Sequence, residues 1–271
     1  MTGREIRLGR LFSNGENAVV VAMDHGEFDG PIPGMIDLPE VIKKVDPGVS
    51  GVLLSPGMIA HCGHAFSYKG SPLAIARLNW SSHLAFHWNY NDAESVEAMG
   101  AEDAVAAGAD IVLVCIALKT GSEARDAANV ASFCRLANDA KRLGMPVIGE
   151  VFPAFSEEVS EEEMHDQVMT GCRIAGELGA DLIKTFHTHN FKAVTESCPV
   201  PVLGLGAKKK PRQLDALQLA EQIVHDGGRG VVFGRNALQV SDPPAFQRAL
   251  CDVVKKGMAA ARAAKDYGLR D

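Results

Sequence analysis

The sequence predicts an α/β protein of the (β/α)8 barrel type, the TIM barrel. The chain has 271 residues, close to the ~250 residues that such a barrel typically takes. Eight short apolar runs recur along it, rich in β-branched residues and bounded by Gly, Pro or Asp, as buried parallel strands are. They span residues 18–23, 51–55, 74–79, 110–117, 146–152, 181–186, 201–206 and 230–234.

Helical segments separate these runs. Three of them end at or next to a glycine, and they span residues 95–108, 122–143 and 213–226. Ser160 followed by Glu163 predicts a capping box at the start of a helix that runs to about Leu178. Uninterrupted strand–helix alternation indicates a parallel sheet, and eight strands favour a closed barrel over an open sheet. No proline-rich or low-complexity linker divides the chain, so we expect residues 1–271 to form one domain.

Composition and charge exclude several function classes. A formal net charge of -7 disfavours a nucleic acid or an anionic membrane as partner. No apolar run approaches the ~20 residues needed to span a bilayer, and the amino-terminal residues lack the apolar stretch of a signal peptide. These features predict a cytoplasmic protein, in which the six cysteines are reduced thiols.

A lysine ends the sixth run. In a barrel the functional groups lie at the carboxyl ends of the strands. Lys184 shares the inward-facing parity of Leu182, and desolvation in an apolar barrel mouth would lower its pKa. The neutral amine would then be a nucleophile toward a carbonyl group. The alternative is a surface lysine that extends its ammonium to water, and parity alone leaves both open.

An aspartate follows the first run. Asp24 has the parity of Val20 and Ala22 and should face the barrel axis, where its carboxylate could pair with Lys184 or assist proton transfer. The alternative is an aspartate that caps a turn at the start of a loop.

The fifth run places Ile148, Glu150 and Phe152 on one face. In an apolar mouth the pKa of the Glu150 carboxyl should rise toward neutrality, which suits general acid–base work. The alternative is a structural ion pair with an arginine of the barrel interior such as Arg77.

Glycine-rich turns with basic residues follow the last two runs. In TIM barrels the loops at this place frequently bind a phosphate group through backbone N–H groups. Glycine would allow the backbone to approach the phosphate oxygens, and lysine and arginine would supply charge. The predicted phosphate-binding residues are Gly206, Ala207, Lys208, Gly234 and Arg235, with Lys209 and Lys210 as further cations.

The histidines raise the possibility of a metal site. His61 with His64, or His187 with His189, could ligate zinc, but the chain lacks a spacing that brings three ligands together. We therefore expect neither a metal ion nor another cofactor.

Three motifs together resemble a known family. They are A-M-D-H-G-x-x-x-G-P at 22–31, G-A-D-L-I-K-T at 179–185 and G-R-N-A-L-Q at 234–239. The sequence resembles the archaeal-type class I aldolases of the DeoC/FbaB group over essentially its whole length. The segment G-A-K-K-K-P-R at 206–212 is most similar to the LsrF-like branch.

The resemblance implies roles for the matching residues. The lysine that matches Lys184 forms a Schiff base with the substrate, the aspartate that matches Asp24 lies beside it, and the two glycine-rich turns bind phosphate. It also implies a homo-octamer or homo-decamer. We further assign His25, Arg77 and Phe152 to substrate binding.

One position departs from the family pattern. The fructose-bisphosphate and heptulosonate branches carry an acid–base tyrosine at the end of the fifth strand, where this chain has Phe152. Phenylalanine cannot exchange a proton, so another group must do so; Glu150 is the candidate on the same strand, and His187 and Asp24 are rivals. Cleavage of fructose 1,6-bisphosphate is therefore not expected.

These observations predict an aldolase or transaldolase that makes or breaks a C–C bond in a phosphorylated ketose, with an aldehyde as the second partner. The alternative within the family is an LsrF-like thiolase that passes an acyl group to coenzyme A. Alternatives of other classes are a non-catalytic sugar-phosphate-binding protein and a zinc-dependent class II aldolase.

Overall fold

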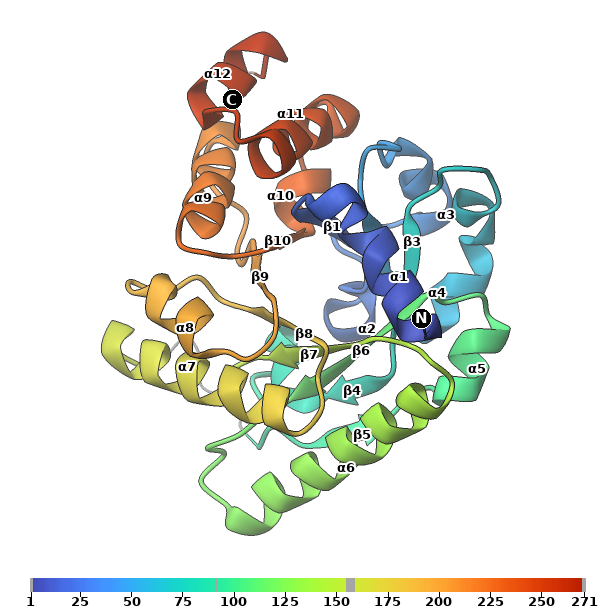
Figure 1. Ribbon diagram of the computed structural model, residues 1–271, viewed down its shortest axis with the longest axis vertical. Coiled ribbons are helices and arrows are strands. Elements are labelled where there is room, and N and C mark those ends of the chain that lie inside the picture. Colours follow the sequence, from blue (N-terminus) through green and yellow to red (C-terminus); the bar gives the residue numbers. More distant parts are fainter. Residues whose placement is uncertain (1, 91, 155–158, 270–271) are drawn as a thin grey trace.

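A closed barrel of eight parallel strands forms the centre of the protein (Figure 1). The computed structural model describes residues 2–90, 92–154 and 159–269. The barrel strands follow the order β1-β10-β9-β8-β7-β6-β3-β2, in which β2 closes on β1. They are β1 (Ala18–Ala22), β2 (Gly51–Leu54), β3 (Leu73–Arg77), β6 (Ile111–Ile116), β7 (Val147–Val151), β8 (Leu182–Thr185), β9 (Val202–Leu205) and β10 (Gly230–Phe233). Each lies within one of the eight apolar runs except at the start of β3, so the predicted fold class is confirmed.

Helices surround the barrel. The longer ones are α6 (Glu123–Arg142), α7 (Glu161–Glu177), α9 (Gln213–His225) and α11 (Pro243–Lys256). The shorter ones are α1 (Gly3–Leu11), α2 (Gly26–Asp29), α3 (Leu38–Val41), α4 (Pro56–His61), α5 (Ala101–Ala106), α8 (Phe191–Ser197), α10 (Arg235–Leu238) and α12 (Ala260–Asp266). Among the described helices, none has both the length and the apolar composition that crossing a bilayer requires.

Alternate residues of the strands fill the barrel interior. They form an apolar cluster that includes Val20, Ile75, Leu113, Ile148 and Leu182. Leu11 at the end of α1 is buried in the same cluster, with Leu8 and Phe12 packed against it. Because α1 closes the amino-terminal end of the barrel, the opposite end, where the strands have their carboxyl ends, is left to form a site.

The predicted helix at 95–108 is wrong in its first part. Residues Ser95–Glu97 form β5, which pairs antiparallel with β4 (Asn79–Ser81), and the helix α5 begins only at Ala101. The third run likewise leaves the barrel after Arg77, because the next residues turn into this small sheet. A partner strand from elsewhere in the chain decided both points, and local periodicity does not contain that information.

The capping box at α7 is half present. The Ser160 hydroxyl accepts a hydrogen bond from the backbone N–H of Glu163 at 3.2 Å, as predicted. The Glu163 carboxylate turns to the ammonium group of Lys119 at 2.7 Å. The helix therefore starts at the expected place with one of the two expected hydrogen bonds.

Candidate active site

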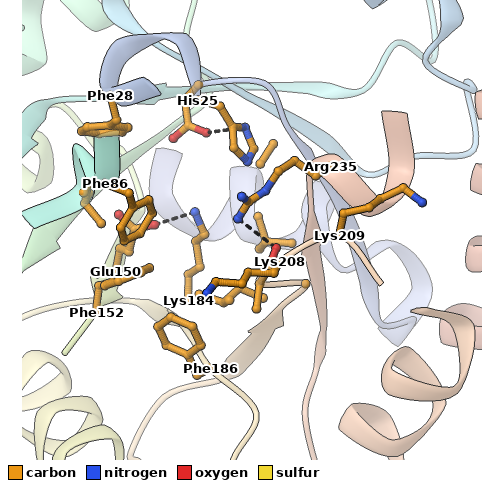
Figure 2. Close-up of a pocket in the computed structure, with 18 of the residues that line it drawn as sticks. His25, Phe28, Phe86, Glu150, Phe152, Lys184, Phe186, Lys208, Lys209 and Arg235 are labelled. Carbon is orange, nitrogen blue, oxygen red and sulfur yellow. Dashed lines mark hydrogen bonds and ion pairs between the residues drawn. The ribbon is translucent and has the colours of Figure 1, made fainter. Parts of the chain in front are cut away.

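A pocket of about 790 Å³ opens at the carboxyl end of the barrel. It is lined by strand ends and by the loops that follow them (Figure 2). The structure brings together in its wall every residue that the sequence assigned to a site: Asp24, His25, Arg77, Glu150, Phe152, Lys184, Gly206, Ala207, Lys208, Gly234 and Arg235.

Strand register explains why the charged groups converge. Arg77, Glu150 and Lys184 each stand two residues beyond a buried apolar residue of the barrel interior, so they form the next inward-facing layer. Glu150 on β7 is also the direct register partner of Lys184 on β8. The inward orientation predicted for Lys184 and Glu150 is therefore confirmed.

Four buried side chains form a chain of alternating charges. The Lys184 ammonium nitrogen lies 2.5 Å from Glu150 Oε1, and Glu150 Oε2 lies 2.7 Å from a terminal nitrogen of Arg77. The Nε atom of Arg77 donates to Asp24 Oδ2 at 2.8 Å. The Phe28 ring covers the guanidinium, with 4.9 Å between Cζ and the ring centroid. Each charge thus has an opposite neighbour, which burial of ionised groups requires.

One role considered for Asp24, an ion pair with Lys184, is wrong, and one considered for Glu150 is confirmed. Lys184 forms its ion pair with Glu150, while Asp24 is bonded to Arg77. The ion pair between Glu150 and Arg77, the structural alternative considered for Glu150, is confirmed.

The expected rise in the pKa of Glu150 is also wrong. Burial alone would raise the pKa of its carboxyl, but the charges of Arg77 and Lys184, with their hydrogen bonds, outweigh burial and hold the pKa below its usual range. The same opposition of burial against Arg77 and Lys184 lowers the pKa of Asp24. Both carboxyls are therefore anions at neutral pH.

Two titratable groups near these four charged side chains are uncharged at neutral pH. Burial lowers the pKa of His25 to about 4, although the charge of Asp24 opposes the shift. The Nδ1 atom of His25 lies 3.9 Å from Asp24 Oδ1. Burial raises the pKa of Glu27, in the short helix α2 that follows His25, to about 8, and both of its carboxyl oxygens are buried without a hydrogen-bond partner. Sequence parity gave no signal for Glu27 because it lies beyond the strand.

The two turns predicted to bind phosphate are held together by Asn236. Its side-chain nitrogen donates to the backbone oxygens of Gly206 at 2.8 Å and Lys208 at 3.1 Å. Its side-chain oxygen accepts from the backbone N–H of Lys210 at 2.7 Å. No sequence pattern pointed to Asn236, although it follows Arg235 directly.

Close packing is a further reason why these turns contain glycine. A Cβ on Gly206 would lie 2.9 Å from the Phe233 ring, and one on Gly234 would lie 2.2 Å from the His25 ring. Ala207, which follows Gly206 in the first turn, adopts a left-handed backbone with φ of 51°. The glycines were expected only to make room for phosphate oxygens, but the turns also need them to close against the barrel.

Aromatic side chains form the wall that faces these turns across Lys184. The ring of Phe152 lies 4.6 Å from that of Phe186 and 5.8 Å from that of Phe86, measured between centroids. The backbone oxygen of Phe152 accepts a hydrogen bond from Nε2 of His83 at 3.2 Å. Phe186 stands two residues beyond Lys184, so strand parity could have found it, but nothing in the sequence pointed to Phe86.

The other histidines lie outside this pocket. His187 pairs with Asp226 on the far side of its loop at 3.0 Å, so it does not reach the charged chain as the proton-handling alternative required. His189 packs against His165 at a centroid distance of 4.8 Å. In the described ranges, no group of three or more His, Cys, Asp or Glu side chains is placed to hold a metal ion.

Buried uncharged histidines predict that stability falls in mild acid. Burial lowers the pKa of His83 from 6.5 to about 4, and it lowers the pKa of His25 to about 4 as well. Unfolded histidines bind protons below about pH 6.5, so between that value and about pH 4 the unfolded state binds more protons and the free energy of unfolding drops as pH falls. Replacing His83 with glutamine should reduce this slope by up to about 1.4 kcal/mol per pH unit in urea unfolding.

Exposed His64 provides the matched control for that measurement. The substitution His64→Gln should leave the pH dependence unchanged. Equal slopes for the natural protein and for His83→Gln would contradict the prediction.

The chain is similar in sequence and structure to known aldolases and to a thiolase. The chain is 29% identical to an uncharacterised aldolase of Saccharolobus solfataricus over 259 residues, which cover 94% of this chain and 95% of the relative. It is 30% identical to a 3-hydroxy-5-phosphonooxypentane-2,4-dione thiolase of Yersinia pestis over 265 residues, which cover 96% of this chain and 85% of the relative. The solved structure of a Schiff-base-forming fructose-1,6-bisphosphate aldolase superposes with a TM-score of 0.79 at 28% identity, covering 93% and 99% of the two chains.

A family model agrees with these relatives. The model of the DeoC/LacD family aldolases matches residues 18–240, which run from β1 to just beyond α10. The matched region contains every strand of the barrel and every residue of the pocket wall named above. The chain belongs to the DeoC/LacD family of aldolases.

Proposed function

We propose that the protein is a class I aldolase or transaldolase that acts on a phosphorylated ketose through a Schiff base on Lys184. The observation that carries the proposal is the position of this buried amine, between a carboxylate at 2.5 Å and a pocket whose other wall consists of the Asn236-held turns. The similarity to a Schiff-base-forming aldolase supports the same reaction class.

In the proposed reaction, the neutral amine of Lys184 attacks the ketone carbon to form a carbinolamine, whose hydroxyl group takes up a proton and leaves as water to give an iminium ion. A base then removes the proton of the β-hydroxyl group, the adjacent C–C bond breaks, and its electron pair moves into the iminium to form an enamine. The aldehyde leaves, the enamine takes up a proton on carbon, and water hydrolyses the resulting iminium to release the ketone.

The contacts among the four charged side chains suggest a separate role for each carboxylate in the reaction. Glu150 remains an anion because Arg77 and Lys184 lower its pKa, so we assign it to orienting the amine and stabilising the iminium charge. Asp24 has one oxygen on Arg77 and the other turned toward His25, which leaves Oδ1 as an acceptor for a substrate proton. His25 and Phe152 would contact the substrate from the pocket wall, and the turns that contain Gly206, Ala207, Lys208, Gly234 and Arg235 would hold its phosphate group.

Borohydride reduction tests the Schiff base directly. The protein would be mixed with a panel of phosphorylated ketoses and ketones, reduced and digested, and its peptides would be weighed by mass spectrometry. We expect one added ligand mass, on the peptide that contains Lys184. Labelling of another lysine, such as Lys119 or Lys208, would reassign the nucleophile, and no adduct with any ketone would favour a non-catalytic sugar-phosphate-binding protein.

The similarity to a thiolase of Yersinia pestis supports a second candidate, transfer of an acyl group to coenzyme A from the same site. Product analysis separates the two functions. A free aldehyde indicates an aldolase, whereas an acyl-coenzyme A that forms only when coenzyme A is added indicates a thiolase.

The homo-octamer or homo-decamer implied by the family resemblance stays a prediction, which light scattering would test.

Arg235 should act mainly on substrate affinity. One of its terminal nitrogens donates to the backbone oxygen of Ala207 at 3.1 Å, and its Nε atom is buried without a partner, so it is placed to accept an anionic ligand. Loss of one charge-assisted contact of about 1.5–3 kcal/mol in Arg235→Ala should raise KM roughly tenfold to hundredfold with a smaller effect on kcat. Steady-state kinetics with inorganic phosphate as a competitive inhibitor would measure it.

Arg248→Ala is the control, because Arg248 pairs with Asp46 away from the pocket. It should leave KM and phosphate inhibition unchanged. If Arg235→Ala kept both values as well, Arg235 would not be a ligand contact.

A further inference from the structure

The pocket has two ends of opposite character. Lys184 stands between them on β8. On one side, the turns after β9 and β10 contribute lysines and an arginine, and on the other side the loops after β7 and β8 contribute phenylalanines. Figure 2 shows this division, with Arg235 and Lys209 on one side of Lys184 and the rings on the other: Phe28, Phe86 and Phe152.

We propose that the aromatic end binds an uncharged, mainly apolar half of the substrate, so that the natural substrate carries one phosphate group and joins a phosphorylated ketone to an apolar aldehyde. This inference rests on the proposed function for the position of the reacting carbon atoms. Its content is the substrate class: a monophosphate with a hydrocarbon or aromatic tail, in place of a bisphosphate.

Two of the rings belong to residues that follow the charged residues of the site along their strands. Phe152 follows Glu150 and Phe186 follows Lys184, each by two residues and on the same inward face, and their rings are in edge contact at 4.6 Å. The aldehyde half of a substrate bound to Lys184 has to leave along this wall if its phosphate-bearing half lies against the opposite turns. Leu84 and Met164 extend the same wall with further apolar surface.

The electrostatics of this end disfavour a second phosphate. Arg77 is the arginine nearest to it, but its guanidinium is covered by Phe28 and already paired with Asp24 and Glu150. His83, which supports Phe152 from behind, is uncharged because burial lowers its pKa to about 4. A phosphate placed against Phe86, Phe152 and Leu84 would lose its hydration without gaining a cation from these apolar side chains, and such desolvation is costly.

Phe86 is the ring at the outer edge of the wall. It is 38% exposed and packs on Phe152, so its substitution should not disturb the barrel. Trp88 lies two residues further along the same loop, is 59% exposed and does not line the pocket. The pair provides a test variant and a matched control on one loop.

Two non-reacting probes of equal chain length separate the possibilities: hexyl phosphate and hexane-1,6-diyl bisphosphate. Isothermal titration calorimetry on the natural protein should show hexyl phosphate binding at least about tenfold more tightly, the equivalent of about 1.4 kcal/mol. Phe86→Lys should remove or reverse this preference, and Trp88→Lys should preserve it. Equal affinity for the two probes, tighter binding of the bisphosphate, or no binding of either would overturn the inference.

The catalytic arm uses the same variants with a phosphorylated ketone that forms the Lys184 adduct. Phenylacetaldehyde should exceed glyceraldehyde 3-phosphate in kcat/KM as acceptor, and Phe86→Lys should shift the ratio toward the phosphorylated aldehyde. An adduct combined with a preference for the phosphorylated acceptor would leave the proposed function intact and overturn only this inference. Tighter binding of hexyl phosphate without any adduct would support this inference and overturn the proposed function.

Discussion

Replacing Lys184 with methionine should abolish turnover. Methionine has a similar length but no amine, so neither the iminium nor the enamine can form, and kcat should fall by on the order of 10⁴-fold or more. Borohydride labelling should disappear together with activity. Both would be measured on the purified variant with a ketone that labels the natural protein.

Lys184→Arg is the control for folding and charge. Arginine can keep an ion pair with Glu150, which lies 2.5 Å from the amine in the natural protein, yet it is not a nucleophile at neutral pH. We expect it to be inactive and as stable as the natural protein in urea unfolding. Appreciable turnover in either variant would mean that the reaction does not pass through this lysine.

Replacing Arg77 with methionine should strongly destabilise the protein. Arg77 is 1% exposed and neutralises two carboxylates, Asp24 at 2.8 Å and Glu150 at 2.7 Å. Removing one member of a buried ion-paired group leaves uncompensated charge and typically costs about 3–5 kcal/mol of unfolding free energy. Chemical denaturation at neutral pH would measure the loss.

A compensating variant distinguishes charge from packing. If unpaired anions cause the loss, adding Asp24→Asn to Arg77→Met should recover a large part of the unfolding free energy, because the remaining pair of Lys184 and Glu150 is then neutral. If the double variant is no more stable than Arg77→Met alone, the contribution of Arg77 is packing against Phe28 and the barrel wall. A wild-type stability for Arg77→Met would show that the charged chain does not hold this end of the barrel together.

The charged chain links these two predictions. Glu150 contacts both Lys184 and Arg77, so a change at either cation alters the environment of the other. The low pKa of Glu150 follows from having two cations, and losing Arg77 should raise that pKa.

The sequence by itself determined the barrel and the composition of its mouth. Eight apolar runs with period-2 parity fixed which residues face inward, and the rule that sites lie at the carboxyl ends of strands selected Asp24, Glu150 and Lys184. The glycine-rich turns after the last two runs marked the other wall in the same way. These features are local in the chain, which is why a single sequence contains them.

Only the tertiary structure decided which charges meet. Parity places Lys184, Glu150, Arg77 and Asp24 in one layer, but the order around the barrel pairs Lys184 with Glu150 and Asp24 with Arg77. That order reversed the expected pKa shift of Glu150, because two cations outweigh burial. The hairpin of β4 and β5, the ring of Phe86 and the hydrogen bonds of Asn236 likewise join segments far apart in the chain, so no local pattern could reveal them.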